Sequence, residues 1–220
     1  VLTWLWFTLF ERMHMLRGFE ETLSDLYLER ERVEMLADRI LQYQLRVLSN
    51  VVQRFPRAIH GVYCSDDWGT QQGPMISPQL WTEFFRPRYQ RLFDQIHAVG
   101  CHVWFHTCGR VNALLEDFID LGVDVLNLEQ PRTLGIEEVG RQCSGRVCFA
   151  SPCDIQNTLP FADAEGIAAE AELLVQCWGT RHGGFIAQDK SGGQAYGATV
   201  EKRRTMFESF IRADRWRENR

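Results

Sequence analysis

Short apolar segments alternate with amphipathic helical segments along most of this chain, and this alternation limits the fold more than any other feature. Each apolar segment is followed by a helical pattern. The five clear ones cover residues 58–64, 101–105, 123–128, 146–150 and 184–187. Strands that alternate with helices at this spacing indicate βα units and a parallel sheet.

The helical segments carry recognisable start signals. Ser77 is a candidate N-cap and Pro78 a favourable first helical residue. The helix that they start should reach about residue 100, with a kink at Pro87, because proline removes a backbone donor. Further helices are expected over 17–52, with a turn at 28–31, and over about 111–121, 133–141, 164–178 and 199–213.

The first ten residues are apolar and are followed by Glu11 and Arg12. A membrane-spanning helix needs about 20 apolar residues, and a secretory signal would begin with a basic stretch, which is lacking here. We therefore interpret residues 1–10 as a buried strand. Because the sequence starts with valine, we expect it to be cut from a longer chain.

Composition excludes several classes of function. Lys plus Arg is 24 and Asp plus Glu is 29, which gives a net charge of −5. This mild acidity argues against a general affinity for nucleic acid or anionic membranes. The seven cysteines form no dense disulfide framework. We expect a reduced, cytoplasmic protein.

The number of βα units favours one architecture. A doubly wound sheet usually carries a G-x-G-x-x-G turn, and the sequence has none. An eight-stranded barrel takes about 250 residues, so five or six units in 220 residues would be its C-terminal part. We predict an α/β fold: a single domain over 1–220, formed by a (β/α)8 TIM-type barrel without its N-terminal strands. The strands should end near Cys64, Phe105, Leu128, Ala150 and Ala187.

Polar residues follow each predicted strand, where such barrels place their active sites. His106 and Cys108 lie two residues apart in an extended segment, so both side chains point to one side. Imidazole and thiolate are zinc ligands, although zinc usually takes at least three protein ligands. The alternative is a hydrogen-bonded histidine beside a buried cysteine.

The loop after the strand at 58–64 is the second candidate. Asp66 and Asp67 could supply a general base, a cation anchor or a clamp for ring N–H groups, and we predict them as catalytic residues. Trp68 and Gln72 of the same loop are candidate substrate-binding residues. The alternatives are helix capping and loop hydrogen bonding for the aspartates, and simple packing for the tryptophan.

Two further loops place amide and carboxylate groups at the same predicted edge. Asn127, Gln130 and Asp154 are candidate substrate-binding residues there, with structural hydrogen bonding as the alternative. Asp189 and Lys190 end the last strand in a glycine-containing polar loop. This loop is not a phosphate-binding loop, because no G-x-x-x-x-G-K-[ST] pattern surrounds it.

Several short motifs occur in the order and spacing of one family. They are DDWG at 66–69, GPMISP at 73–78, FxPRY at 85–89, HTCG at 106–109, DxLNxxQP at 124–131 and QxxLP at 156–160. Over about residues 8–210 the chain resembles the uroporphyrinogen decarboxylase superfamily. The resemblance implies a (β/α)8 barrel of which the N-terminal third is missing here.

The resemblance implies one of two chemistries. Decarboxylases of the superfamily remove carboxylates from a cyclic tetrapyrrole without a cofactor, whereas methylcobamide:thiol methyltransferases bind zinc through His-x-Cys and a later cysteine. His106 and Cys108 match that motif, but Lys190 stands about where the later ligand is expected. Asp189 is our candidate third ligand, with Cys153 and Glu129 as alternatives.

The resemblance favours zinc-assisted methyl transfer from a methyl-corrinoid to a thiol. Uroporphyrinogen decarboxylation in porphyrin biosynthesis is the alternative, and a non-catalytic corrinoid-binding module is a third hypothesis. The implied ligands and partners are a small-molecule or tetrapyrrole substrate and a corrinoid protein, with no nucleic acid and no membrane. A homodimer is one expected assembly, because missing strands would leave an open sheet edge.

Overall fold

The computed structural model describes residues 1–190 and 192–218. These residues include a parallel sheet of six strands whose order in space is their order in the chain. The strands are β1 Leu2–Leu5, β2 Gly61–Ser65, β3 His102–His106, β4 Val125–Asn127, β5 Cys148–Ser151 and β6 Phe185–Ala187. The predicted parallel sheet is confirmed, and the observed ends of β2 to β6 lie within one residue of the predicted ones.

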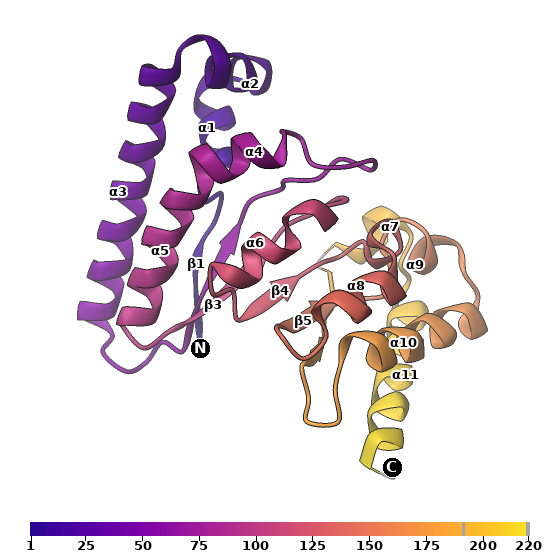
Figure 1. Cartoon of the computed structure of the whole chain (residues 1–220). Coiled ribbons are helices and arrows are strands. Elements are labelled where there is room, and N and C mark those ends of the chain that lie inside the picture. Colours follow the sequence, from indigo (N-terminus) through magenta and orange to yellow (C-terminus); the bar gives the residue numbers. More distant parts are fainter. Residues whose placement is uncertain (191, 219–220) are drawn as a thin grey trace.

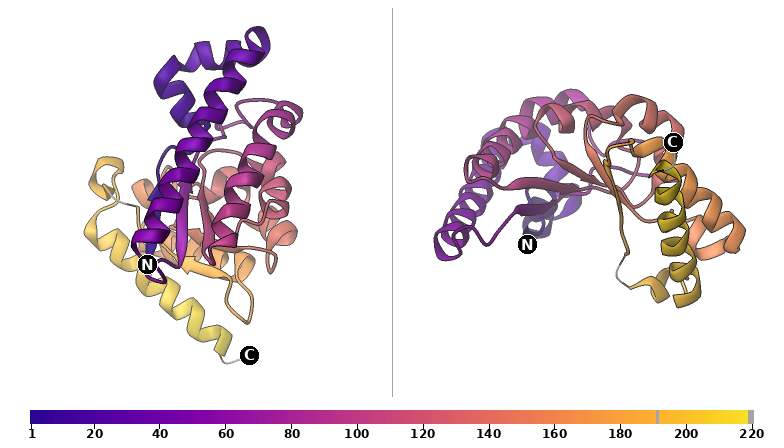
Figure 2. Two further views of the ribbon diagram at one scale, coloured as in Figure 1. Left: turned by 90° about the vertical axis from the view of Figure 1, so that its left-hand side faces the viewer. Right: turned by 90° about the horizontal axis from the view of Figure 1, so that it is seen from below.

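The sheet curves, and helices cover its outer face (Figures 1 and 2). The outer helices are α3 Arg30–Arg54, α5 Arg86–Ala98, α6 Leu115–Asp120, α8 Ile136–Cys143, α10 Ala164–Trp178 and α11 Val200–Glu218. Six successive βα units in one direction are what a (β/α)8 barrel contains. The fold is therefore of this type, as predicted, and the described part supplies six of the eight units.

Short helices lie at the loops. They are α1 Phe10–Arg17, α2 Phe19–Leu28, α4 Pro78–Leu80, the 3-10 turn η2 Asn112–Leu114, α7 Pro131–Leu134, α9 Thr158–Phe161 and the 3-10 turn η3 Gly193–Tyr196. The expected helix over 17–52 is split into α2 and α3 at Glu29, inside the predicted turn. The expected helix over 133–141 is interrupted at Gly135, whose φ of +82° is incompatible with a continuing helix.

Strand β1 differs from its prediction as a buried strand over 1–10. It is only four residues long, because α1 begins at Phe10. It lies at the edge of the sheet beside β2, and the Trp4 side chain is 48% exposed. Apolar composition alone does not distinguish such an edge strand from a central one.

The predicted kink at Pro87 is replaced by a π-helical turn, Trp81–Phe85, between α4 and α5. The N–H of Arg86 donates to the carbonyl of Trp81, five residues earlier. A proline lacks the backbone donor and crowds the carbonyl four residues before it. The wider turn lies just ahead of Pro87, so the helical segment continues to Ala98.

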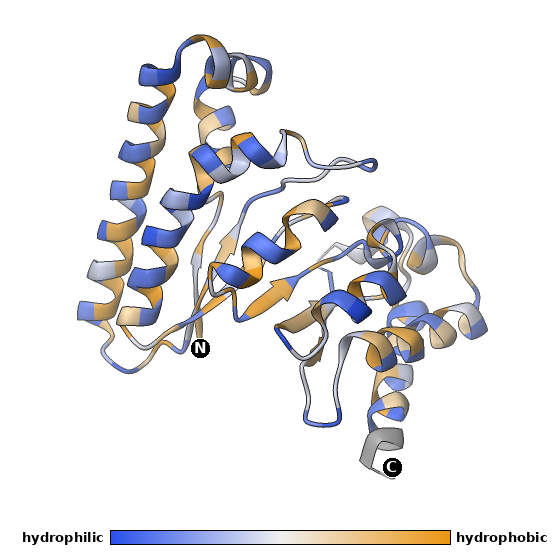
Figure 3. Cartoon of the chain, viewed as in Figure 1, coloured by the Kyte–Doolittle hydropathy of each residue, from blue (hydrophilic) through white to orange (hydrophobic). Residues whose placement is uncertain are grey.

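The main core lies between the sheet and its helices. Strand residues that face the helices are fully buried, and several aromatic side chains pack on them. This layer contains Phe10, Trp68, Trp81, Phe84, Phe85, Tyr89, Phe93, Phe105 and Phe118. Figure 3 shows the hydrophobic residues concentrated on the strands, whereas the outer helices carry both hydrophobic and hydrophilic residues. Among the described residues, no helix combines the length and apolar character needed to cross a membrane.

Candidate metal and substrate site

A pocket of about 340 Å³ lies at the carboxyl ends of β1–β4 and β6, beside the first turn of α1. Its size is in the range of small-molecule sites. Parallel strands end at one edge, so loops far apart in sequence meet there. Its lining residues are Trp4, Trp6, Phe7, Glu11, Tyr63, Ser65, Asp67, His106, Glu129, Gln188, Asp189 and Lys190.

Three potential metal ligands converge in this region. Ligand atoms of Asp67, His106 and Cys108 all lie within 4.8 Å of one another. His106 Nε2 is 3.5 Å from Cys108 Sγ and 3.6 Å from Asp67 Oδ1. Nitrogen, thiolate sulfur and carboxylate oxygen form a donor set that suits zinc. The residues present therefore fit a zinc ion, and because zinc usually takes four ligands, one further ligand would complete the set.

The orientation of His106 is set by Asn127. His106 Nδ1 lies 2.9 Å from Asn127 Oδ1, and the Asn127 amide donates to Ala150 O at 3.0 Å and Gln188 Oε1 at 2.8 Å. The two donated bonds identify Oδ1 as the acceptor, so the proton of a neutral His106 is on Nδ1. Nε2 then presents its lone pair towards Cys108, as in metal sites where an outer residue orients the histidine.

Cys108 is held as a thiol in the metal-free protein. Burial raises its pKa, and the negative charges of Asp67 and Glu129 raise it further. Its backbone N–H donates to Asp67 Oδ1 at 2.8 Å, which fixes the carboxylate beside the sulfur. Coordination to a metal ion deprotonates a thiol, so a bound cation would reverse this preference.

The two adjacent aspartates point in different directions. Asp66 is fully buried and accepts the N–H groups of residues 9–11 at 2.7–3.0 Å and the hydroxyl of Tyr89. Burial raises its pKa to about 6, although these donors oppose the shift. Asp66 therefore caps α1, whereas Asp67 reaches the pocket. The structure does not bring the predicted catalytic pair together.

The other predicted residues of the 66–72 loop lie away from the pocket. Trp68 is fully buried on the helix side, stacks on Phe10 with ring centres 4.7 Å apart, and donates its ring N–H to Tyr89 at 3.3 Å. Gln72 is exposed, and its backbone N–H donates to Thr70. Neither side chain lines the described pocket.

Gln130 and Asp154 brace loops. Gln130 Oε1 accepts the N–H of Gly109 at 2.9 Å, so it connects the loops after β3 and β4. Asp154 is fully buried and accepts backbone N–H groups of Arg132, Gln156 and Asn157 at 2.7–3.1 Å. By these contacts Gln130 and Asp154 connect loops, whereas Asn127 contacts His106 directly.

Asp189, predicted as the third metal ligand, has another partner. It forms two hydrogen bonds with the guanidinium of Arg203, one of them 2.9 Å long. Among the described residues, the clustered ligand group contains Asp67 instead. Lys190 is paired with Glu129. Burial lowers the pKa of Lys190, but the hydrogen bond and charge of Glu129 raise it more.

Sequence reasoning missed Glu11. Its carboxylate accepts the Ser65 hydroxyl at 3.2 Å and lines the pocket. Burial raises its pKa to about 8, and the nearby charges of Asp66 and Asp67 act in the same direction. Glu11 is 55 positions from Asp66, so only the fold brings the three carboxyls together.

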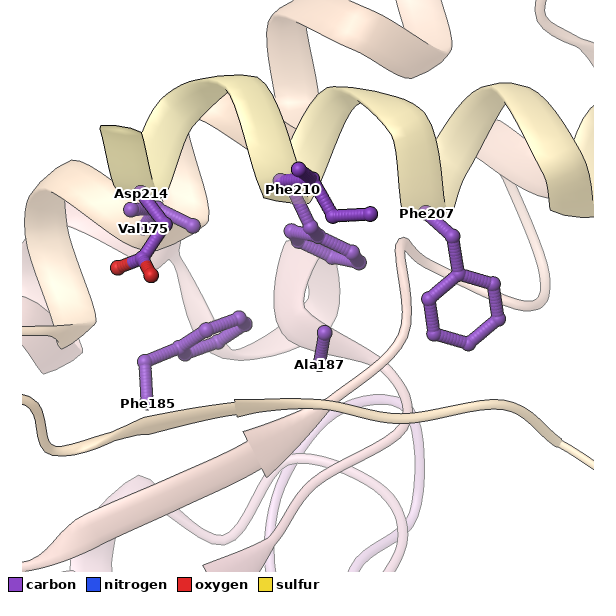
Figure 4. Close-up of a pocket in the computed structure, with 7 residues that line it drawn as sticks. Val175, Phe185, Ala187, Phe207, Phe210 and Asp214 are labelled. Atoms are coloured by element: carbon purple, nitrogen blue, oxygen red, sulfur yellow. The ribbon is translucent and has the colours of Figure 1, made fainter. Parts of the chain in front are cut away.

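A second pocket lies between β6, α10 and α11 (Figure 4). It is lined by apolar side chains apart from Asp214: Val175, Phe185, Ala187, Phe207, Phe210 and Ile211. It contains no converging set of polar groups, so we assign no chemistry to it.

The fold and the ligand cluster thus define a parallel α/β barrel with a candidate zinc centre at the carboxyl end of its strands. A family model described as uroporphyrinogen decarboxylase (URO-D) matches residues 7–209. The chain belongs to the uroporphyrinogen decarboxylase family, and the resemblance inferred from its motifs is confirmed.

Two curated relatives and one solved structure are named as methyltransferases. Two proteins named methylcobamide:CoM methyltransferase MtaA, both from Methanosarcina barkeri, are 27% identical over 103 residues and 26% identical over 108 residues. Each match covers 46% of this chain and 29% of the relative. A solved structure described as a methyltransferase from Methanosarcina mazei has a TM-score of 0.72 at 16% identity. The match covers 91% of this chain and 55% of the Methanosarcina mazei chain, and it confirms the fold.

Proposed function

We propose that this chain belongs to an enzyme that transfers a methyl group from a methyl-corrinoid to a thiol with the help of zinc. The cluster of Asp67, His106 and Cys108 carries this proposal, because it offers three zinc ligands in the expected barrel position. The names of the relatives support it. We also propose that residues 1–220 form a single domain, which the contiguous core supports.

Zinc would be held by Asp67, His106 and Cys108, and when bound it lowers the pKa of a coordinated thiol. Asn127 keeps the His106 proton on Nδ1, so that Nε2 remains a ligand. Tyr63 donates its hydroxyl to the same Asn127 oxygen at 2.8 Å and so holds it in place.

The transfer itself is a nucleophilic displacement. The substrate sulfur loses its proton to solvent and forms a bond to the methyl carbon. The carbon–cobalt bond of the donor breaks, and its electron pair stays on cobalt. Glu129 and Lys190 form a neutral pair in the pocket wall, so neither adds a net charge beside the sulfur. A corrinoid protein that presents the donor is the proposed partner.

Zinc content is the first test. The purified protein should hold about one equivalent, and His106→Ala, Cys108→Ser and Asp67→Asn should each remove most of it. Cys177→Ser and Asp189→Asn are matched controls, since neither residue belongs to the cluster. Demethylation of methylcobalamin by added thiols, lost in the same variants, then tests the reaction.

Decarboxylation of uroporphyrinogen is the second candidate, favoured by the family match over residues 7–209. Release of carbon dioxide from the porphyrinogen by metal-free protein would support it. Corrinoid binding without turnover of either substrate would indicate a non-catalytic module. A protein without zinc, unchanged by substitutions in the cluster, would refute the methyl-transfer proposal.

A further inference from the structure

The two loops that carry the candidate metal ligands are in direct backbone contact. Asp67 lies in the loop after β2, His106 ends β3, and Cys108 lies in the loop that follows. Strands β2 and β3 are inner strands of the sheet, and each has a described neighbour on both sides. The relative position of the three ligands therefore depends on contacts within the part of the barrel that the structure describes.

Hydrogen bonds between β2 and β3 continue into these loops. The N–H of Asp66 donates to the carbonyl of His106 at 3.1 Å, and the N–H of Gly69 donates to the carbonyl of Cys108 at 3.0 Å. The N–H of Cys108 donates in the other direction, to Asp67 Oδ1 at 2.8 Å. Asp67 and Cys108 are thus held beside each other by the backbone of the two loops, before any metal ion binds.

Two glycines allow the loops to approach this closely. A Cβ atom on Gly69 would lie 2.6 Å from the carbonyl carbon of Gly109 and 2.7 Å from the carbonyl oxygen of Cys108. A Cβ atom on Gly109 would overlap the carbonyl group of Gly69. Non-bonded heavy atoms pack at about 3.5–4.0 Å, so neither position has room for a side chain. Gly109 also has a φ of +81°, which favours glycine.

The surroundings of this contact are rigid. On both sides the atoms that a new methyl group would meet belong to backbone, so no flexible side chain could move aside. The N–H of Gly109 is also bound to Gln130 Oε1 at 2.9 Å, which holds this loop from its other side. A methyl group would therefore separate the loops themselves. Gly109 adjoins Cys108, and Gly69 follows Asp67 by two residues, so the separation would reach both ligands.

We propose that Gly69 and Gly109 are positioning residues of the metal centre, because their contact sets the distance between Asp67 and Cys108 and thereby the affinity for zinc. The inference rests on the proposed zinc site and adds two residues that are not ligands. Distances between zinc and its ligands vary by only about 0.2 Å in proteins. A small separation of the two loops is therefore enough to weaken binding.

Zinc affinities of four alanine variants of the full chain test this inference, measured by competition with a chelating dye. Gly69→Ala and Gly109→Ala should each weaken zinc binding by about tenfold or more, as substitutions behind metal ligands do. Gly73→Ala should retain the affinity, because a Cβ there would meet no described atom within 4 Å. Gly140→Ala is the control for lost stability. Its Cβ would lie 2.6 Å from the carbonyl oxygen of Cys177, in a contact between α8 and α10.

Cobalt(II) spectra separate a positioning role from a general loss of stability. Cobalt(II) bound in place of zinc absorbs visible light in bands that depend on ligand geometry. Gly69→Ala should change these bands, whereas Gly140→Ala should leave them unchanged even where urea unfolding shows equal stability. Zinc affinity and cobalt bands that remain unchanged in both Gly69→Ala and Gly109→Ala would overturn the proposal.

A variant without added bulk covers the case in which the alanine variants do not fold. The Thr107 hydroxyl oxygen accepts the N–H of Trp68 at 3.0 Å, between the same two loops. Thr107→Val removes this acceptor and keeps the shape of the side chain, so it should loosen the contact and weaken zinc binding several-fold. Unchanged zinc affinity in this variant, with the alanine variants unfolded, would overturn the proposal.

A measurement on metal-free protein distinguishes this inference from the proposed function. Amide hydrogen exchange over residues 106–110 reports the bond from Cys108 to Asp67. Exchange in this segment should rise several-fold more in Gly69→Ala than in Gly140→Ala. That result in a protein that takes up no zinc would support the loop contact and refute the zinc site. Equal exchange in both variants of a protein that binds zinc would refute the positioning role and leave the zinc site standing.

Discussion

The two faces of the sheet differ in how their polar groups are satisfied. On the face towards the helices, the Asp66 carboxylate accepts four hydrogen bonds from the protein. On the inner face, polar atoms of Asp67, His106 and Glu11 point into a pocket. The first arrangement stabilises the fold, and the second leaves groups available to a ligand.

Asp66 and Asp67 show that the difference depends on a single position. Successive strand residues point to opposite faces, and the chain keeps this alternation as it leaves β2. Tyr63, on the inner face, contacts Asn127, whereas Cys64 is fully buried on the other side. Neighbouring residues of the same type therefore have different roles, and substitutions can test this separation.

The largest expected effect is on the helix-facing side. Trp68→Ala should lower the free energy of unfolding by about 3–5 kcal/mol, because it empties a fully buried site and leaves the Tyr89 hydroxyl without its indole donor. Urea unfolding measures it. Trp6→Ala, at a tryptophan that is 49% exposed, is the comparison and should lower the free energy of unfolding by less than about 1 kcal/mol. Equal costs at both positions would contradict the division between the faces.

The next effect concerns the metal affinity of the inner face. Asn127→Ala should weaken zinc binding by about 10- to 100-fold, because His106 loses the acceptor that orients it. Competition with a chelating dye measures the affinity. Asn112→Ala, whose side chain donates to the carbonyl of Leu134 and does not contact His106, is the control. Unchanged zinc affinity in the Asn127 variant would show that the ring is oriented by something else.

A pH-dependent effect is expected at Glu11. Its pKa is about 8 in the folded protein against an ordinary value of 4.5, so the folded state holds the proton more tightly. Stability should therefore fall as pH rises from about 4.5 to about 8. Glu11→Gln removes this dependence. In thermal unfolding with a chelator present, the melting temperature of the variant should rise relative to that of the original protein between pH 5 and pH 8.5. A difference in melting temperature that does not change with pH would contradict the shifted pKa.

The smallest effect is expected at the opposite end of the strands. Asp124 accepts hydrogen bonds from His97 at 2.9 Å and from the Val103 N–H at 2.7 Å. Burial raises the pKa of Asp124, but these hydrogen bonds lower it more. The carboxylate therefore stabilises the folded state at neutral pH, and this stabilisation is lost in acid. Because the Asp124 side chain is partly exposed, Asp124→Asn should lower the free energy of unfolding by less than about 1 kcal/mol at pH 7, as measured by urea unfolding. Zinc content should not change.

The fold could be predicted from the sequence because it depends on local patterns. Apolar runs of strand length and helical periodicity located the βα units, and the strand ends near Cys64 and Phe105 were predicted within one residue. His106 and Cys108 could be predicted as neighbouring ligands, because side chains two residues apart in an extended segment point to the same side.

The remainder of the site depends on contacts between distant loops. The sequence does not show which of Asp66 and Asp67 turns towards α1, since that choice depends on backbone N–H groups 55 to 57 positions away. Asp189 was predicted as a ligand from its place after the last strand. Its pairing with Arg203 across a loop could not be anticipated from local pattern.

The π-helical turn at Trp81–Phe85 has a consequence for how this segment can change in evolution. Its closing bond spans five residues, where an α-helix spans four, so the turn contains one residue more than a regular helix would. Deleting one residue would let α4 and α5 fuse into one regular helix. Each residue of such a helix turns the chain by about 100°, so Trp81 would rotate away from the position where its ring now stacks on Tyr89. A single-codon deletion here should therefore be far less tolerated than one in the exposed 70–73 loop, because it would move a buried aromatic side chain out of its packing.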